Sequence, residues 1–279
     1  MGRAWDMVDG LDQRGGVSQL VARTIIGVAK SLKDTTANRH LSVVRWSPTR
    51  QAWIHRWPGG LVIDRKRWST PEEWATNGDY DMPDLLWTEY QPKPGDTVID
   101  VGAGHGGETY FLASMVGERG KVLAVEAAPR PFGRLQEMVE INGWEHVHPV
   151  QVALSDRVGT VRITDDEDNW IAANIYADAT DGVDVSATTF DDLCQDHGIT
   201  TVDWVKMNIE GAEKDAIRGM ERMAPHVRHM TIACHDWLGT EWGRSREQVL
   251  TWLHDHGFRT RLHGRENTWD GDYVHAWRD

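Results

Sequence analysis

Cysteine is scarce in this sequence of 279 residues, which contains only Cys194 and Cys234. Two cysteines cannot form the disulfide framework of a small secreted domain, and so low a number is typical of a protein in a reducing compartment. Apolar residues lie close to both positions, which favours buried thiols over reactive nucleophiles. We therefore expect a cytoplasmic protein.

Long apolar runs are missing as well. No stretch approaches the roughly 20 residues that cross a membrane, and the first residues lack the basic and apolar regions of a signal peptide. Basic residues are outnumbered, because 30 Lys and Arg stand against 43 Asp and Glu, for a formal net charge of −13. Binding to phosphate backbones needs a basic surface, so we expect no nucleic-acid partner and no transmembrane segment.

The sequence does supply a core, since 40% of its residues are hydrophobic. Residues 17–33 have the apolar spacing of an amphipathic helix, and residues 41–64 contain three short segments typical of strands, separated by turns. We therefore expect residues 1–90 to form an N-terminal appendage of helix and small β-sheet. Two roles stay open for it, a lid over a substrate or a contact in a homo-oligomer.

Residues 91–279 alternate between segments typical of strands and of helices. The pattern predicts strands at 97–101, 122–126, 147–154, 202–209 and 228–234, and helices at 84–91, 131–142, 190–197, 213–220 and 247–256. A hairpin is expected from 158–164 and 184–188, and a closing antiparallel pair from 259–262 and 273–277. Alternating βα units imply an α/β fold with a mostly parallel sheet, which binds ligands at the carboxyl ends of its strands.

The segment after the first of these strands is the most informative in the chain. An apolar run reaches Asp100, and Gly102, Gly104, Gly106 and Gly107 follow within a few positions. Glycine lets backbone approach a ligand closely, so the pattern predicts a nucleotide cradle between a strand and a helix. The spacing also fits the dinucleotide fingerprint, but a carboxylate here would repel a pyrophosphate. Asp100 therefore favours S-adenosylmethionine, whose sulfonium and amino-acid group attract a carboxylate.

Further candidate residues fall at the ends of the next strands. Glu126 ends the second strand, where a carboxylate can bind the two hydroxyls of a ribose. Ala153, Leu154 and Ser155 end the third, where an adenine would lie against apolar side chains with a polar group nearby.

A second motif spans residues 206–213, with the sequence KMNIEGAE. A strand delivers Asn208 and Glu210 to the edge of the sheet, and Gly211 permits a tight turn into the next helix. The neighbouring strand delivers His235 to the same edge. A lone histidine is more often structural, but its charged and amide neighbours favour a proton acceptor near neutral pH.

Together these motifs resemble the FkbM family of S-adenosylmethionine-dependent methyltransferases. The matching segments are PGDTVIDVGAG (94–104), VEAAPR (125–130) with Asn142 and Gly143, ALSD (153–156) with Gly159, TFDDL (189–193), and VKMNIEGAE (205–213) with Gly219. The resemblance covers roughly residues 80–262. It implies a class I methyltransferase (Rossmann-like) fold and methylation of a hydroxyl group, often on a sugar or natural product.

On this basis we assign the cofactor site and the acceptor chemistry. We expect S-adenosylmethionine to bind at Asp100, Gly102, Ala103, Gly104, Glu108, Thr109, Glu126, Ala127, Ala153, Leu154, Ser155 and Asn208. In-line methyl transfer to a small-molecule or glycan hydroxyl would use His235 as general base, Glu210 to orient it or the acceptor, and Asn208 as hydrogen-bond donor.

Two positions depart from the family pattern, and they keep alternatives open. The usual Asp is Asn208 here, and the usual Asn after the second glycine is His105. Without the Asp a potential metal ligand is lost, so we predict that no metal is used. The glycine spacing and Glu126 also fit an NAD(P)-dependent oxidoreductase, and Asn208 fits a non-catalytic cofactor- or glycan-binding module.

Overall fold

The computed structural model describes residues 23–24, 26–32, 42–68, 70–76, 81–163, 182–264 and 271–278. The chain divides into two compact units, Met1–Asp79 and Tyr80–Asp279. Residues 23–24 and 26–32 of the helix expected at 17–33 are helical, and the rest of that segment lies outside the described residues.

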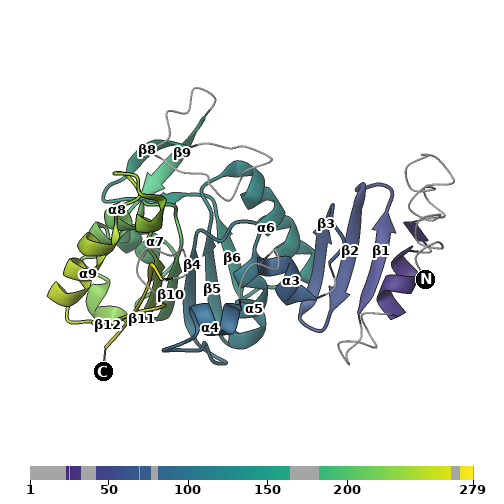
Figure 1. Ribbon diagram of the computed structural model, residues 1–279, viewed down its shortest axis with the longest axis horizontal. Coiled ribbons are helices and arrows are strands. Elements are labelled where there is room, and N and C mark those ends of the chain that lie inside the picture. The colour runs from purple at the N-terminus through teal and green to yellow at the C-terminus, as the bar shows by residue number, and fades with distance from the viewer. Residues whose placement is uncertain are drawn as a thin grey trace. The chain divides into compact units, whose positions relative to one another are not determined.

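The first unit contains a three-stranded antiparallel sheet in the order β1-β2-β3 (Figure 1). Its strands are β1 (Val43–Ser47), β2 (Ala52–Trp57) and β3 (Gly60–Asp64), close to the three segments predicted. Ile26, Val44 and Trp53 form a small buried core beside this sheet. The short helix α3 (Pro71–Thr76) follows and was not predicted.

The second unit is built on a seven-stranded sheet in the order β12-β13-β11-β10-β4-β5-β6 (Figure 1). The strands are β4 (Thr97–Val101), β5 (Lys121–Val125), β6 (Val147–Val150), β10 (Val202–Met207), β11 (Val227–Ala233), β12 (Arg259–Leu262) and β13 (Tyr273–Trp277). The five strands from β11 to β6 pair in parallel, whereas β13 runs antiparallel to β11 and β12. The predicted mostly parallel sheet with an antiparallel final pair is confirmed.

Helices cover this sheet, because its central strands are apolar on both faces. Val98 and Ile99 are successive residues of β4 that point to opposite faces, and both are fully buried. The helices are α4 (Met82–Leu86), α5 (Gly107–Val116), α6 (Pro129–Asn142), α7 (Phe190–Asp196), α8 (Glu213–Arg218) and α9 (Arg246–Asp255), with short 3₁₀ turns η2 (Ala224–His226) and η3 (Asp236–Leu238). The helix expected at 84–91 is α4, which starts earlier because Asp81 caps the N–H of Asp84.

The single strand predicted at 147–154 is wrong. The chain leaves the seven-stranded sheet after β6, an edge strand that tolerates Pro149 because its missing N–H is not needed there. Residues 153–154 form β7 (Ala153–Leu154) in a second sheet of order β7-β9-β8. Its other strands, β8 (Gly159–Ile163) and β9 (Val183–Thr188), form the predicted antiparallel hairpin.

Both cysteines are buried and free, as expected. Burial raises the pKa of the Cys194 thiol to about 12, so this group is a poor nucleophile near neutral pH. Within the ranges that the structure describes, no helix has the length and apolarity required to span a membrane.

Candidate active site

The fold gathers the candidate residues at one edge of the seven-stranded sheet. Strands β5, β4, β10 and β11 are consecutive neighbours that run in parallel, so their carboxyl ends lie side by side. Glu126, Gly102, Asn208 and His235 each follow one of these ends. Ligands of open α/β sheets bind in this position.

The glycine loop is shaped largely by contacts within the chain. Gly102 has a φ of 75°, and a Cβ atom there would lie 1.9 Å from the carbonyl oxygen of Asn208. Gly106, with a φ of 97°, would place a Cβ 2.4 Å from Cε of Met138. These two glycines therefore permit close packing against β10 and α6, a requirement that the sequence did not reveal.

Asp100 is fully buried beneath this loop. Its Oδ2 accepts a hydrogen bond of 2.6 Å from the Thr109 hydroxyl, and its Oδ1 lies 3.2 Å from Nζ of Lys206. The Lys206 ammonium also donates to the Gly102 carbonyl at 2.6 Å and lies 4.0 Å from Oε2 of Glu108. Burial alone would lower the pKa of Lys206, but the Asp100 and Glu108 carboxylates outweigh it and raise that pKa. Sequence analysis missed Lys206, although a lysine within an apolar strand was a usable signal.

Glu126 connects the end of β5 to the glycine loop. Its Oε2 accepts a hydrogen bond from the Gly104 N–H and its Oε1 accepts one from the Ala128 N–H, both at 2.8 Å. Burial raises the pKa of Glu126, and these two N–H groups counteract that effect. Each carboxylate oxygen keeps a second lone pair, which could accept a ribose hydroxyl.

The residues assigned to the adenine divide between two apolar clusters. Ala127 and Ala153 pack in the small cluster around Ala128 beside the second sheet. Leu154 belongs to the main core, and Ser155 is buried with its N–H bound to the Thr188 carbonyl.

Asn208 has a buried side-chain oxygen that lacks a hydrogen-bond donor among the described residues. Its backbone N–H donates to the Val101 carbonyl at 3.0 Å, which fixes it beside the glycine loop. Its side-chain oxygen Oδ1 is buried and accepts no hydrogen bond from the residues that the structure describes. A buried acceptor without a donor is costly, so this atom indicates a ligand that supplies an N–H or O–H group.

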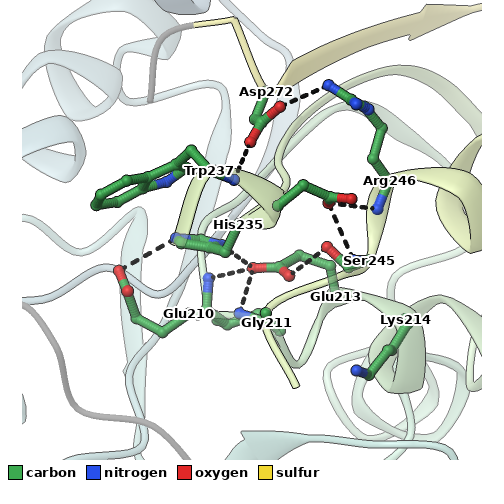
Figure 2. Close-up of polar contacts among 12 residues, drawn as sticks. Glu210, Gly211, Glu213, Lys214, His235, Trp237, Ser245, Arg246 and Asp272 are labelled. Carbon is green, nitrogen blue, oxygen red and sulfur yellow. Dashed lines mark hydrogen bonds and ion pairs between the residues drawn. The ribbon is translucent and has the colours of Figure 1, made fainter. Parts of the chain in front are cut away.

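His235 lies between two carboxylates (Figure 2). Its Nε2 is 3.3 Å from Oε1 of Glu210, and its Nδ1 is 3.1 Å from Oε1 of Glu213. Burial alone would lower the pKa of His235, but Glu213 and Glu210 raise it to about 10. The ring is therefore an imidazolium at neutral pH and has no lone pair for a proton, which disfavours the general-base role expected of it.

Glu213 is the second residue that sequence analysis did not place in the site. It is fully buried at the start of α8, and its Oε1 also accepts hydrogen bonds from the N–H groups of Ile209 and Gly211. Its Oε2 accepts one from the Ser245 hydroxyl. Although burial opposes ionisation, the charge and hydrogen bond of His235 and the Ile209 N–H lower the pKa of Glu213, so it remains a carboxylate.

Glu210 occupies a strained turn between β10 and α8. It is one of two non-glycine residues with positive φ in the described part of the chain, at 55°. Such strain is often found at functional sites, where the surrounding structure enforces it. Its side chain is 18% exposed, whereas that of His235 is 5% exposed, so Glu210 is the more accessible partner.

The loop after His235 is held by acidic side chains (Figure 2). Oδ2 of Asp236 accepts hydrogen bonds from the N–H groups of Ser245 and Arg246, at 3.1 and 2.9 Å. Asp272 accepts one from the Trp237 N–H and another from the Arg246 guanidinium, both at 2.6 Å. These contacts fix the loop and leave the Trp237 side chain 44% exposed beside His235.

The ligand sets that hold metal ions in proteins combine several side chains. Within the described ranges, no group of three His, Cys, Asp or Glu residues could hold a metal ion. The absence of a metal requirement stays a prediction.

The strand order, the glycine loop at the end of β4 and the acidic residue at the end of β5 define a class I S-adenosylmethionine-dependent methyltransferase. The family model of the Methyltransferase FkbM domain matches residues 100–260, more than half of the chain. The chain belongs to this family, and S-adenosylmethionine is its cofactor. The nicotinamide alternative is thereby excluded.

Individual relatives are more distant. The chain is 25% identical to the 31-O-demethyl-FK506 methyltransferase FkbM of Streptomyces tacrolimicus over 202 residues, 60% of this chain and 74% of that protein. It is 40% identical to the protein-L-isoaspartate O-methyltransferase of Aeropyrum pernix over 65 residues, 23% of this chain and 24% of that protein. The crystal structure of a methyltransferase FkbM from Methylobacillus flagellatus KT matches with a TM-score of 0.50 and 14% identity, over 75% of this chain and 50% of that one. That last likeness concerns the fold alone.

Proposed function

We propose that this protein is an O-methyltransferase that methylates a hydroxyl group of a small molecule or a glycan. The observation that carries the proposal is the Glu210 carboxylate, partly exposed at the carboxyl edge of the sheet and ion-paired with His235. The names of two relatives, a 31-O-demethyl-FK506 methyltransferase and a protein-L-isoaspartate O-methyltransferase, support transfer to oxygen.

The residues present fit the cofactor. The unmatched Oδ1 of Asn208 could accept a hydrogen bond from the amino group of the methionine moiety, and Glu126 could accept the ribose hydroxyls. Bound S-adenosylmethionine supplies a methyl group activated by a sulfonium. The methyl group passes to the acceptor oxygen, and the sulfur is left as a neutral thioether. The protein then has to align the acceptor and remove its hydroxyl proton.

We assign proton removal to Glu210. Oε1 of Glu210 is paired with His235, and no described residue donates a hydrogen bond to the other oxygen. Asp236 is a poorer candidate, since its Oδ2 already accepts two backbone N–H groups. When Glu210 takes the proton and becomes neutral, Glu213 still balances the charge of His235. His235 thus positions Glu210 rather than accepting the proton itself.

The test is methyl transfer by the full chain. The purified protein is incubated with S-adenosylmethionine carrying a deuterated methyl group and with a panel of sugars, glycans and hydroxylated natural products, and the products are analysed by mass spectrometry. The position of the label, read by NMR, distinguishes an O-methyl group from an N- or C-methyl group. Glu210→Gln serves as the matched control, because it keeps the side-chain volume and removes the carboxylate.

The outcomes separate this proposal from its rival. A labelled methyl ether or ester that wild type forms and Glu210→Gln does not form supports the proposal. Calorimetric binding of S-adenosylhomocysteine without methyl transfer to any acceptor would instead support a non-catalytic cofactor- or glycan-binding module.

Two further properties are proposed with this function. The unit Met1–Asp79 would act as a substrate lid or as a contact in a homo-oligomer, and the enzyme would act in the cytoplasm. Light scattering of the full chain tests the oligomer, and cell fractionation tests the location.

A further inference from the structure

A buried lysine beneath the cofactor loop is not used by the mechanism above. Lys206 lies in the interior of β10, and its side chain is only 2% exposed. Ammonium groups are almost never buried without compensating partners, because they lose their hydration. The partners of Lys206 all belong to the segment that forms the cofactor site.

These contacts join three elements at one nitrogen. Nζ of Lys206 donates to the carbonyl of Gly102 in the glycine loop at 2.6 Å and lies 3.2 Å from Oδ1 of Asp100 at the end of β4. It also lies 4.0 Å from Oε2 of Glu108 in the first turn of α5. Thr109 in the same turn binds the other oxygen of Asp100. The lysine therefore ties β10 to the loop and to the start of α5.

The same cluster sets the charge beneath the cofactor loop. With both carboxylates ionised, Asp100 and Glu108 contribute two negative charges and Lys206 one positive charge, for a net charge of −1. Burial raises the pKa of Asp100, and the Lys206 ammonium opposes that effect. The methyl donor has a cationic sulfonium, whereas its product, S-adenosylhomocysteine, has a neutral thioether. A nearby charge therefore changes the affinity for the donor more than the affinity for the product.

We propose that Lys206 is a positioning residue of the cofactor site, which fixes the glycine loop and sets how strongly the site discriminates the cationic donor from the neutral product. Without Lys206 the site would be at least as negative and would prefer the donor at least as strongly. This role concerns only the binding of S-adenosylmethionine and S-adenosylhomocysteine, so it holds for whichever acceptor the enzyme methylates.

A charge series tests the proposal by calorimetry with S-adenosylmethionine and S-adenosylhomocysteine at pH 8. Asp100→Asn brings the cluster to 0, and the double variant Lys206→Met/Asp100→Asn returns it to −1. Lys206→Met alone removes the ammonium that opposes protonation of the buried Asp100, so the charge of its cluster lies between −2 and −1. The quantity compared is the Kd for S-adenosylhomocysteine divided by the Kd for S-adenosylmethionine. This ratio should fall in Asp100→Asn by about three- to thirtyfold, the range for one charge at close range under partial screening. In Lys206→Met the ratio should equal or exceed the wild-type value.

The double variant and a distant lysine provide the controls. The ratio in Lys206→Met/Asp100→Asn should return to the wild-type value even if both affinities are weaker. Lys121→Met removes a partly buried lysine that donates to the His197 carbonyl at the opposite end of the sheet, and it should leave the ratio unchanged.

A purely structural role for Lys206 would weaken both ligands equally and give a constant ratio across the series, and that result would overturn the proposal. If Lys206→Met does not fold, Asp100→Asn and the double variant still differ by one charge and decide the question. Failure of the wild type to bind either ligand would be a separate result that concerns the cofactor itself.

Discussion

Oε1 of Glu213 lies 3.1 Å from Nδ1 of His235 and also accepts the backbone N–H groups of Ile209 and Gly211. One fully buried oxygen atom therefore fixes the turn after β10 and the side chain at the end of β11. The strained backbone of Glu210 lies within that turn, so the geometry of the proposed proton acceptor depends on this pair.

The first prediction concerns the pH dependence of stability. Because the pKa of His235 rises from 6.5 to about 10 on folding, the ion pairs contribute their full stabilisation below about pH 6.5. The contribution is lost as the pH rises through about 10, where the folded protein also releases the proton. The free energy of unfolding, measured in urea from pH 6 to 10, should fall more steeply for wild type than for His235→Gln, by a few kcal/mol in total, to order of magnitude.

His235→Gln also controls for the other titrating groups, because it shares them with wild type and their effects cancel when the two stability curves are compared. NMR of the His235 ring checks the cause directly, because its signals should stay those of an imidazolium at pH 8 in wild type. In Glu213→Gln the ring should titrate at a lower pH. Parallel stability curves for wild type and His235→Gln would contradict the assignment.

The second prediction separates the roles of Glu210 and His235 once an acceptor is known. Glu210→Gln should lower kcat by about 10²- to 10⁴-fold, the usual contribution of a positioned proton acceptor, with little change in affinity for S-adenosylhomocysteine. His235→Gln should lose less, because glutamine retains a polar contact to Glu210. If His235 were the acceptor, wild-type turnover would rise as the pH approaches 10, and we expect no such rise.

Most of the fold was predictable because strand and helix periodicities are local. The break between β6 and β7 was not, since the apolar pattern continues across residues that pair in two different sheets. The carboxyl ends of parallel strands lie at one edge of a sheet, and this general rule placed Asn208 and His235 at the same edge, in agreement with the observed strand order.

The protonation states in the site could not be predicted, because they depend on contacts between distant residues. Lys206 and Asp100 are 106 positions apart in the sequence, and nothing local indicates that one neutralises the other. Glu213 was visible as the end of a motif, but only its burial against His235 shows that it keeps the ring charged.

The third prediction tests the cofactor loop with two glycines of similar positive φ. Gly104 has a φ of 57° and Gly117, at the far end of α5, has a φ of 60°. Alanine at either position should cost about 1 kcal/mol of stability or more, because a positive φ disfavours a Cβ atom. Only Gly104→Ala should also weaken S-adenosylhomocysteine binding in calorimetry. Equal affinity in the two variants would argue that Gly104 does not contact the cofactor.

The fourth prediction is that methyl transfer needs no metal. Asn208 supplies no anionic ligand at the family's usual Asp position, and within the described ranges no three potential ligands are grouped. Treatment with a chelator followed by dialysis should leave turnover unchanged. Activity that disappears with the chelator and returns with magnesium would refute this prediction.

The fifth prediction concerns the buried Oδ1 of Asn208, which has no hydrogen-bond donor among the described residues. Replacing Asn208 by alanine should not lower the stability of the free protein, but it should weaken cofactor binding. In the free protein, Asn208→Ala removes a buried acceptor that has no donor among the described residues, so the free energy of unfolding should stay equal or rise. Affinity for S-adenosylhomocysteine should fall by about tenfold or more, because a hydrogen bond to a charged amino group contributes about 1.5–3 kcal/mol. Asn208→Asp keeps an oxygen at this position and should retain most of the affinity. Loss of stability in Asn208→Ala together with unchanged affinity would show that the oxygen is satisfied within the chain and does not bind the cofactor.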